Sequence, residues 1–331
     1  MRLMRPLLVL SVCALAFGVL PSRRVALAKS SSTSRSRGRK AAFRLAVTVD
    51  DLPGGGPEIA EFSHVRIVSD IIATLQAHHV KRPAGFVVGS MLEGHPERQD
   101  ALDAWVGAGF EVGNHSYSHR SLFDLGLNAF LDDVAKNRAV TDPLEKLSGQ
   151  SVRYFRYPYL DEGRSETERR ALARFLGSNH YTVARVSIDF ADWGYADAYG
   201  RCLRHQNSHA LELLGQSYIA NAIASLQWSM AVAHEVLGHS IPYVLLLHAN
   251  VATEHFLDEL LTRYEDMGAR YVPLSEALAE PAYTASYSTP GGNVLVEASK
   301  ELKRPRSPGL PRPLELLDLA CEERPVTPPL L

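Results

Sequence analysis

The feature that most constrains the fold is a repeated alternation of short strand-like runs with longer helical patterns. Seven runs rich in β-branched, aromatic and aliphatic residues are each followed by a segment with helical periodicity. The expected strands occupy residues 44–49, 85–90, 110–114, 152–157, 181–190, 243–249 and 270–274. Such an alternation is typical of an α/β fold with a parallel sheet, either open or closed into a barrel.

The two segments that precede the first strand have a different composition. Residues 1–28 combine a basic start, a short apolar run and Ala26-Leu27-Ala28, which is typical of a cleavable signal peptide, with an uncleaved anchor as the second interpretation. Residues 29–41 are expected to be a disordered linker, because "KSSSTSRSRGRK" contains no apolar residue. We therefore expect an exported protein, periplasmic or secreted, with no stable membrane span after signal cleavage.

Cleavage would also change the charge of the chain. It would remove four arginines and no acidic residue, so the formal net charge would change from −2 to −6. This balance argues against nucleic acid as a partner. The apolar density then predicts one sizeable domain at residues 42–280.

Residues 281–331 are predicted to be a Pro-rich C-terminal extension, with "RPRSPGLPRP" at its centre. It contains one candidate strand at 293–298 and one candidate helix at 313–321. Cys202 and Cys321 would remain after cleavage, and export would permit a disulfide, but their distance in sequence leaves the pairing open.

Polar side chains follow five of the seven expected strands. In parallel α/β folds the chemistry collects at the carboxyl ends of the strands, so these residues are expected on one rim. They are Asp50 and Asp51; His115 and His119; Arg156, Pro158 and Tyr159; Asp189, Asp192 and Trp193; and His248.

The spacing of two histidines in "GNHSYSH" (113–119) suggests a metal site. His115, His119 and one of the paired aspartates would make a His/His/carboxylate shell with its fourth position open to water. An ion there lowers the pKa of its water and polarises a carbonyl, while the second carboxylate accepts the proton. Zn²⁺ is the expected ion, with Co²⁺, Ni²⁺ and Mn²⁺ as alternatives. Hydrolysis of an amide also needs an acid, and His248 is placed for that role.

Five segments in order resemble the motifs of the polysaccharide deacetylases, the NodB-homology or carbohydrate esterase family 4 group. They are "TVDDLP" (48–53), "HSYSH" (115–119), "RYPYL" (156–160), "DFADW" (189–193) and "LLLHA" (245–249). The resemblance implies a distorted (β/α)7-type barrel. It also implies a metal-dependent hydrolase, acting on carbon–nitrogen bonds other than peptide bonds. Such an enzyme removes acetyl groups from N-acetylated, or O-acetylated, carbohydrate, with metal-bound water as the nucleophile and an acetylated glycan as its partner.

The resemblance further implies a role for each matching residue. The implied metal ligands are Asp51, His115 and His119. The implied catalytic group comprises Asp50 as general base, Arg156 orienting it, the Tyr159 backbone N–H at the oxyanion, and Asp192 positioning the general acid His248. The implied residues of the acetate pocket are Trp193, Leu246 and Pro158.

The chain departs from the family pattern at four places. Val49 stands where Phe is usual, "LPGGGP" replaces a simpler "GP", Leu160 replaces Gly, and Ala249 replaces Asp. None of these departures removes a reacting group. They lie at the edge of the expected pocket, so they leave the identity of the glycan open.

Two alternative functions compete with this prediction. "HEVLGH" (234–239) resembles the HExxH motif of zinc proteases but has one residue too many. Its histidines would therefore point about 140° apart on a helix and could not face one ion. The other alternative is a non-catalytic glycan-binding homologue, which the retention of Asp50 and His248 disfavours.

Overall fold

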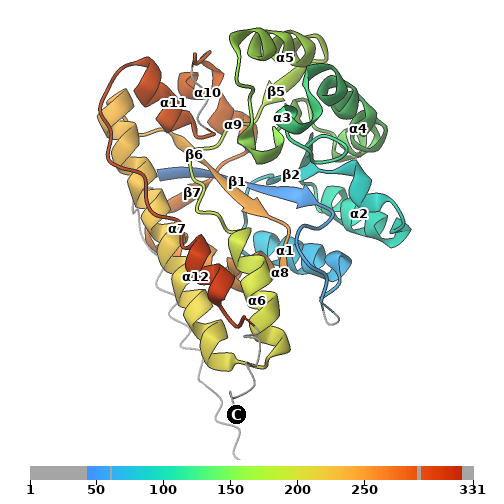
Figure 1. Cartoon of the computed structure of the whole chain (residues 1–331), viewed down its shortest axis with the longest axis vertical. Helices are drawn as coiled ribbons and strands as arrows, with labels where there is room; N and C mark the ends of the chain where they lie inside the picture. Colours follow the sequence, from blue (N-terminus) through green and yellow to red (C-terminus); the bar gives the residue numbers. More distant parts are fainter. Residues whose placement is uncertain (1–42, 60–61, 289–291, 323–331) are drawn as a thin grey trace, which may run out of the picture. The chain divides into compact units, whose positions relative to one another are not determined.

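The computed structural model describes residues 43–59, 62–288 and 292–322 (Figure 1). The predicted signal peptide and linker, residues 1–41, lie outside the described residues. Within the described part of the chain, no helix combines the length and the apolar character that crossing a membrane requires.

Seven parallel strands form one sheet, which confirms the α/β prediction. The strands are β1 (Phe43–Leu52), β2 (Ala84–Val87), β3 (Glu111–Asn114), β4 (Arg153–Phe155), β5 (Tyr181–Val183), β6 (Pro242–His248) and β7 (Ala269–Tyr271). Their order is β5-β4-β3-β2-β1-β6, and β7 pairs with β1 beside this path. The long strand β1 is thus paired with β2, β6 and β7.

The register between β1 and β6 positions the chemistry. Asp50 and His248 are opposite each other at the last pair of this ladder. Strand β6 ends at His248, and two residues later Asn250 caps the next helix, because its side chain accepts from the N–H groups of Ala252 and Thr253. The two polar strand ends therefore lie side by side.

The sheet is not closed into a complete barrel. The sequence predicts a strand over 181–190, whereas β5 ends at Val183. The irregular stretch that follows still reaches β6 through a single parallel bridge between Ile188 and Leu245, and the Leu246 N–H donates to the Ile188 carbonyl at 3.0 Å. Among the described residues this bridge is the one β-type link between the two sides, so the (β/α)7 arrangement is distorted.

Helices pack around the sheet and follow the strands in the predicted order. They are α1 (His64–Ala77), α2 (Gln99–Gly107), α3 (Leu122–Leu125), α4 (Leu127–Ser148), α5 (Glu166–Ser178), α6 (Gly194–Arg204), α7 (Ser208–Leu237), α8 (Val251–Asp266), α9 (Leu274–Leu278) and α10 (Pro281–Thr284). Short 3₁₀ turns lie at Gly89–Leu92, Pro96–Arg98 and Pro158–Leu160. The helical segment that follows the fifth expected strand is divided into two helices, α6 and α7, which pack against each other.

The extension corrects one sequence-based expectation and confirms another. The predicted strand at 293–298 is wrong, because these residues begin helix α11 (Val294–Glu301). Asn293 caps this helix by accepting from the Leu295 N–H at 2.9 Å, and one face carrying Leu295 and Ala298 is buried. The predicted helix at 313–321 contains α12 (Leu314–Leu319).

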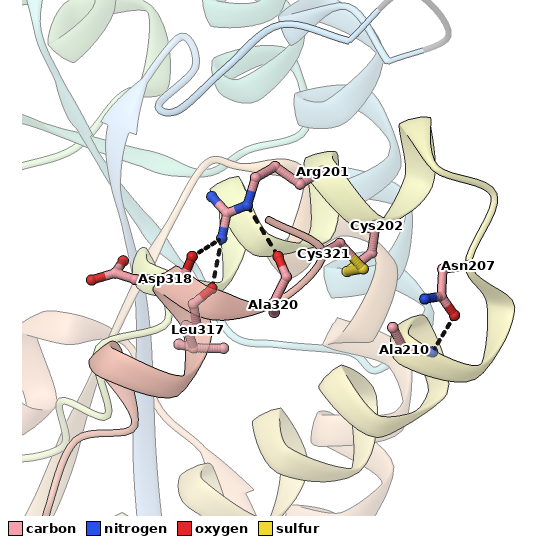
Figure 2. The surroundings of a disulfide bond; sticks show 8 residues. All are labelled: Arg201, Cys202, Asn207, Ala210, Leu317, Asp318, Ala320 and Cys321. Atoms are coloured by element: carbon pink, nitrogen blue, oxygen red, sulfur yellow. Dashed lines mark hydrogen bonds between the residues drawn. A yellow bond between two sulfur atoms is a disulfide. The ribbon is translucent and has the colours of Figure 1, made fainter. Parts of the chain in front are cut away.

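A disulfide ties the end of the extension to the domain. Cys202 on α6 and Cys321 after α12 are joined across 119 positions of sequence. Beside the disulfide, the Arg201 guanidinium donates to the carbonyls of Leu317, Asp318 and Ala320 (Figure 2). Helix α12 is therefore fixed against α6 (Figure 1).

Candidate active site

One pocket of about 720 Å³ gathers most of the predicted site residues at the carboxyl ends of the strands. Those that line it are Asp50, Asp51, His115, His119, Tyr159, Trp193, Leu246 and His248. Arg156, Asp192 and Pro158 are buried and do not appear in its lining. The polar groups that the sequence assigns to different strand ends are thus brought to one cavity.

Asp51, His115 and His119 form a cluster whose ligand atoms all lie within 4.8 Å of one another. Asp51 Oδ1 lies 3.2 Å from His119 Nε2 and 3.7 Å from His115 Nε2. This oxygen is buried and has no hydrogen-bond partner among the described residues, which is costly unless a cation completes its coordination. The donor set therefore fits a divalent ion.

The environment of His115 supports the same conclusion. Its Nδ1 lies 2.8 Å from the Arg156 carbonyl, which accepts a hydrogen bond from it and leaves Nε2 directed at the carboxylates. Burial, assisted by the neighbouring His119, lowers the pKa of His115 to about 3. The ring is therefore neutral at pH 7, as metal ligation requires.

The turns that present these ligands have an unusual backbone conformation. Asp51, Ser116 and His119 have φ values of 63°, 63° and 54°, in the left-handed region that side chains other than Gly and Asn seldom adopt. Asn114, at the end of β3, holds the turn because its Oδ1 accepts from the Ser116 N–H at 2.9 Å. No sequence pattern marks Asn114 as a site residue, and its one signal is its place directly before the histidine motif.

Asp50 is a nearly inaccessible carboxylate, 2% exposed, with one fixed partner. Arg156 Nη1 donates to Asp50 Oδ1 at 2.6 Å and to Thr48 Oγ1 at 2.8 Å. Burial raises the pKa of Asp50 above its ordinary value, and the Arg156 charge opposes that rise. The other oxygen, Oδ2, lies 3.5 Å from His115 Nε2 and so faces the metal-ligand cluster. This arrangement suits a carboxylate that accepts a proton there.

His248, which lines the same pocket, forms a second charged pair with Asp192. His248 Nδ1 lies 2.7 Å from Asp192 Oδ1, and Asp192 Oδ2 accepts from the His248 N–H and from Thr253 Oγ1. Burial by itself would lower the pKa of His248, but the Asp192 carboxylate raises it to about 10. His248 therefore keeps its proton at neutral pH, and Nε2 is the nitrogen left to donate it.

The turn after β4 carries Tyr159 and Leu160, both with left-handed φ values of 57° and 55°. The N–H groups of Leu160 and Asp161 donate to the carbonyls of Tyr157 and Pro158. The described residues provide no acceptor for the Tyr159 N–H. The family's usual Gly at position 160 suits this backbone, whereas Leu160 adopts it and packs beside Gly292 of the extension.

The glycine run after Asp51 has a steric cause. The Gly55 N–H donates to the Ala249 carbonyl at 2.8 Å, which draws this loop onto the metal-ligand cluster. A Cβ atom on Gly55 would lie 2.9 Å from Asp51 Cβ, and one on Gly54 would lie 2.4 Å from the His64 ring. Larger residues at these positions would displace the ligand turn.

Part of the pocket comes from residues that the sequence argument did not assign to it. From α7 and the extension these are Asn221, Ser225, Trp228, Gly292, Asn293, Val296, Gly309, Leu310, Pro311 and Arg312. No motif marks them, and only the folding of the extension onto α7 brings them to the pocket.

The HEVLGH segment takes no part in this site. It ends α7, and its His239 Nε2 lies 3.2 Å from Glu280 Oε1. Glu235 accepts from the Ser307 N–H and hydroxyl. The metal-ligand cluster found in the described ranges contains none of these residues.

Comparison with known families agrees with the motifs. The family model described as polysaccharide deacetylase matches residues 37–179. This part of the chain is similar to the polysaccharide deacetylase family. The matched segment includes Asp50, the metal-ligand cluster and Arg156, whereas Asp192 and His248 lie beyond it.

The individual relatives are distant. A Bacillus cereus protein named peptidoglycan-N-acetylglucosamine deacetylase is 22% identical over 236 residues, which are 70% of this chain and 66% of that protein. The chain thus spans slightly less than two thirds of that relative's length.

Two solved structures are also similar to this chain. The peptidoglycan deacetylase PdaC from Bacillus subtilis is 22% identical, with a TM-score of 0.46 over 73% of this chain and 94% of that one. A mutant of a Bacillus anthracis carbohydrate esterase family 4 pseudoenzyme, described as having restored activity, is 19% identical. Its TM-score is 0.49 over 72% of this chain and 69% of that one.

Proposed function

We propose that this chain is a metal-dependent hydrolase that removes acetyl groups from N-acetylated, or O-acetylated, carbohydrate. The observation that carries the proposal is the placing of Asp50 and His248 at one register position of adjacent strands, beside a three-ligand metal cluster. A proton acceptor, a metal site and a proton donor thus share one pocket. The proposed location is periplasmic or secreted, on the strength of the signal-like residues 1–28.

Asp51, His115 and His119 would hold one divalent ion, with Zn²⁺ the first choice for this ligand set. When bound, the ion would polarise the acetyl carbonyl and lower the pKa of a water molecule. The remaining steps belong to the chain's own residues.

Asp50 takes a proton from the attacking water, and Arg156 holds the carboxylate in position for this transfer through the 2.6 Å contact. The backbone N–H of Tyr159 donates a hydrogen bond to the acetyl oxygen as negative charge develops on that oxygen. His248 Nε2 then donates a proton to the departing nitrogen, and Asp192, which is paired with Nδ1, keeps the imidazole protonated until this transfer. Trp193 and Leu246 line the part of the pocket proposed for the acetyl methyl group.

The test is acetate release by the purified chain, supplied with zinc, from N-acetylglucosamine oligomers. In His248→Gln, kcat should fall by about 10²–10⁴-fold while metal content and substrate binding remain, because only the proton donor is lost. His239→Gln, which changes a histidine outside the pocket, is the matched control and should keep wild-type turnover.

Two outcomes would oppose the proposal. Wild-type turnover in His248→Gln would refute the acid role. A wild-type protein that binds zinc and glycan but releases no acetate from N- or O-acetylated substrates would instead be a non-catalytic glycan binder.

A further inference from the structure

One wall of the pocket is formed by residues 309–312 of the extension, here called the extension wall. On its N-terminal side, Trp228 Nε1 on α7 donates to the Pro308 carbonyl at 2.7 Å. On its C-terminal side, α12 packs so closely that a Cβ atom on Gly194 would lie 2.6 Å from Leu314 Cδ2. The wall thus spans two anchored points at the pocket.

The second anchor is strengthened at the far end of α12. The Arg201 contacts and the disulfide between Cys202 and Cys321 hold this helix on α6 (Figure 2). The extension wall is therefore an attached part of the pocket, and its side chains have defined positions there.

Arg312 gives this wall a positive charge. Among the described residues that line the pocket, it is the one lysine or arginine, whereas Asp50, Asp51 and Asp189 supply carboxylates. Its side chain is 49% exposed, and its Nη2 donates to Asp189 Oδ2 at 2.6 Å. Asp189 is itself held, since its Oδ1 accepts from the Ala191 N–H at 2.9 Å.

This geometry leaves most of the guanidinium for a ligand. A guanidinium has five N–H donors in a planar fork, and within the described ranges the bond to Asp189 occupies one of them. The planar fork suits a carboxylate, which can accept two parallel hydrogen bonds, better than an uncharged hydroxyl. Because the bond to Asp189 fixes the orientation of the guanidinium, Arg312 loses less side-chain conformational entropy when a ligand binds.

The neighbouring surface suits a sugar. The rings of Trp193 and Tyr159, which are 47% and 69% exposed, both border the same pocket. Large amphipathic rings of this kind can pack against the apolar face of a pyranose while their polar edges stay hydrated. The pocket thus combines the reacting groups, aromatic faces and the guanidinium of Arg312.

We propose that Arg312 forms an anion subsite that selects acetylated sugars bearing a carboxylate near the acetyl group. This inference rests on the proposed deacetylase function and adds a substrate class to it. The competing explanation is that the ion pair with Asp189 only tethers the extension wall.

The experiment compares kcat/KM for acetate release from neutral and acidic substrates. The neutral substrate is an N-acetylglucosamine oligomer. One acidic substrate is a hyaluronan oligosaccharide, with the carboxylate on the adjacent ring. The other is a peptidoglycan disaccharide, with a lactyl carboxylate on an acetylated ring. The proteins are the zinc-loaded wild type, Arg312→Ala, Arg312→Lys and Lys300→Ala, which removes the positive charge of an exposed residue on α11.

In Arg312→Ala, the acidic-to-neutral ratio of kcat/KM should fall by about tenfold or more, mainly through KM for the acidic substrate, because a charged hydrogen-bonded pair is lost. Arg312→Lys should retain part of the ratio, and Lys300→Ala should keep all of it. The acidic substrate whose KM rises identifies which carboxylate is bound. An unchanged acidic-to-neutral ratio in Arg312→Ala would overturn the subsite. An equal loss of kcat/KM on acidic and neutral substrates that Arg312→Lys restores would also overturn it, and would show that Arg312 only tethers the extension wall.

Failure of the proposed function would look different. A wild-type protein that releases acetate from neither class would overturn the deacetylase proposal while the subsite could still be measured by equilibrium binding of the same oligosaccharides. About tenfold weaker binding of an acidic oligosaccharide to Arg312→Ala would support the subsite. Equal binding by both proteins would overturn it.

Discussion

The two sides of the pocket are built in different ways. Strands β1, β3 and β4, within the region that matches the family, present the proton acceptor and the metal-ligand cluster from buried ends. The later part of the chain supplies the proton donor and, through α7 and the extension, a wall with exposed side chains. Reacting groups require a fixed orientation, which burial and hydrogen bonds provide. Wall residues can change what they contact without disturbing that orientation.

The largest expected effect lies on the strand side, at the metal-ligand cluster. In His115→Ala, we expect metal content to fall from about one ion per chain to none and acetate release to be lost, because the cluster keeps only two ligands. Elemental analysis of the purified proteins measures this directly. His239→Ala should retain the ion, and an ion that persists in His115→Ala would place the metal elsewhere.

The next effect separates metal binding from proton transfer on that same side. Asp50→Asn should lower kcat by about 10²–10⁴-fold and leave metal content unchanged, because the amide cannot accept the proton but keeps the shape of the side chain. The measurements are steady-state acetate release and elemental analysis. Asp103→Asn, an exposed change on α2, serves as the control. Persistent activity in Asp50→Asn would show that another group is the base.

Across the pocket, the pairing of His248 with Asp192 predicts a change in pH dependence. Asp192 raises the pKa of His248, so the acid is protonated at neutral pH and loses its proton only as the pH rises towards about 10. In Asp192→Asn, the His248 pKa should fall, so activity should decline from a lower pH, with a loss of about tenfold for each unit by which that pKa falls below the assay pH.

A pH profile of kcat/KM tests this assignment. Thr253→Val, which removes one hydrogen bond to Asp192 but keeps the carboxylate, is the control and should not move the alkaline limb to lower pH. Coincident profiles for the wild type and Asp192→Asn would contradict the assignment.

The smallest expected effect on catalysis concerns the wall side. Replacing both Cys202 and Cys321 with Ser should destabilise the fold by about 2–4 kcal/mol, because the chain loses a covalent link across 119 positions. KM should rise a few-fold through a looser wall, with kcat nearly unchanged. Thermal unfolding and steady-state kinetics, each with and without reductant, measure the two effects. A larger change in kcat than in KM would contradict the claim that the wall side affects substrate binding and leaves the reacting groups in place.

Much of the fold could be predicted because local patterns and tertiary structure agree. All seven strand positions follow from short apolar runs, five of which are followed by polar residues. The segment 184–190 was predicted as strand because it is apolar, but its burial comes from contacts with β6 rather than from a continuous ladder. The segment 293–298 is equally apolar, and so short a run cannot distinguish a strand from a buried helix face.

The site also contains residues that local sequence predicts and residues whose position depends on the tertiary fold. The residues proposed for the chemistry were predictable, because only a few side-chain types can bind metal or move protons, and they stand at strand ends. Arg312 and Trp228 were not, because their place at the pocket depends on how the extension folds back onto α7. The disulfide was left open for the same reason, since its formation requires α12 to lie on α6.

The shared register position of Asp50 and His248 has a consequence for how such a protein can change over evolutionary time. The separation of their backbones is set by the spacing of two hydrogen-bonded strands, about 4.7–4.9 Å, and not by any loop. Insertions, deletions or a different tail can therefore alter the outer surface without moving the two groups apart. A lineage built on this ladder can acquire a new sugar preference by exchanging its tail, and it inherits the spacing between proton acceptor and donor unchanged.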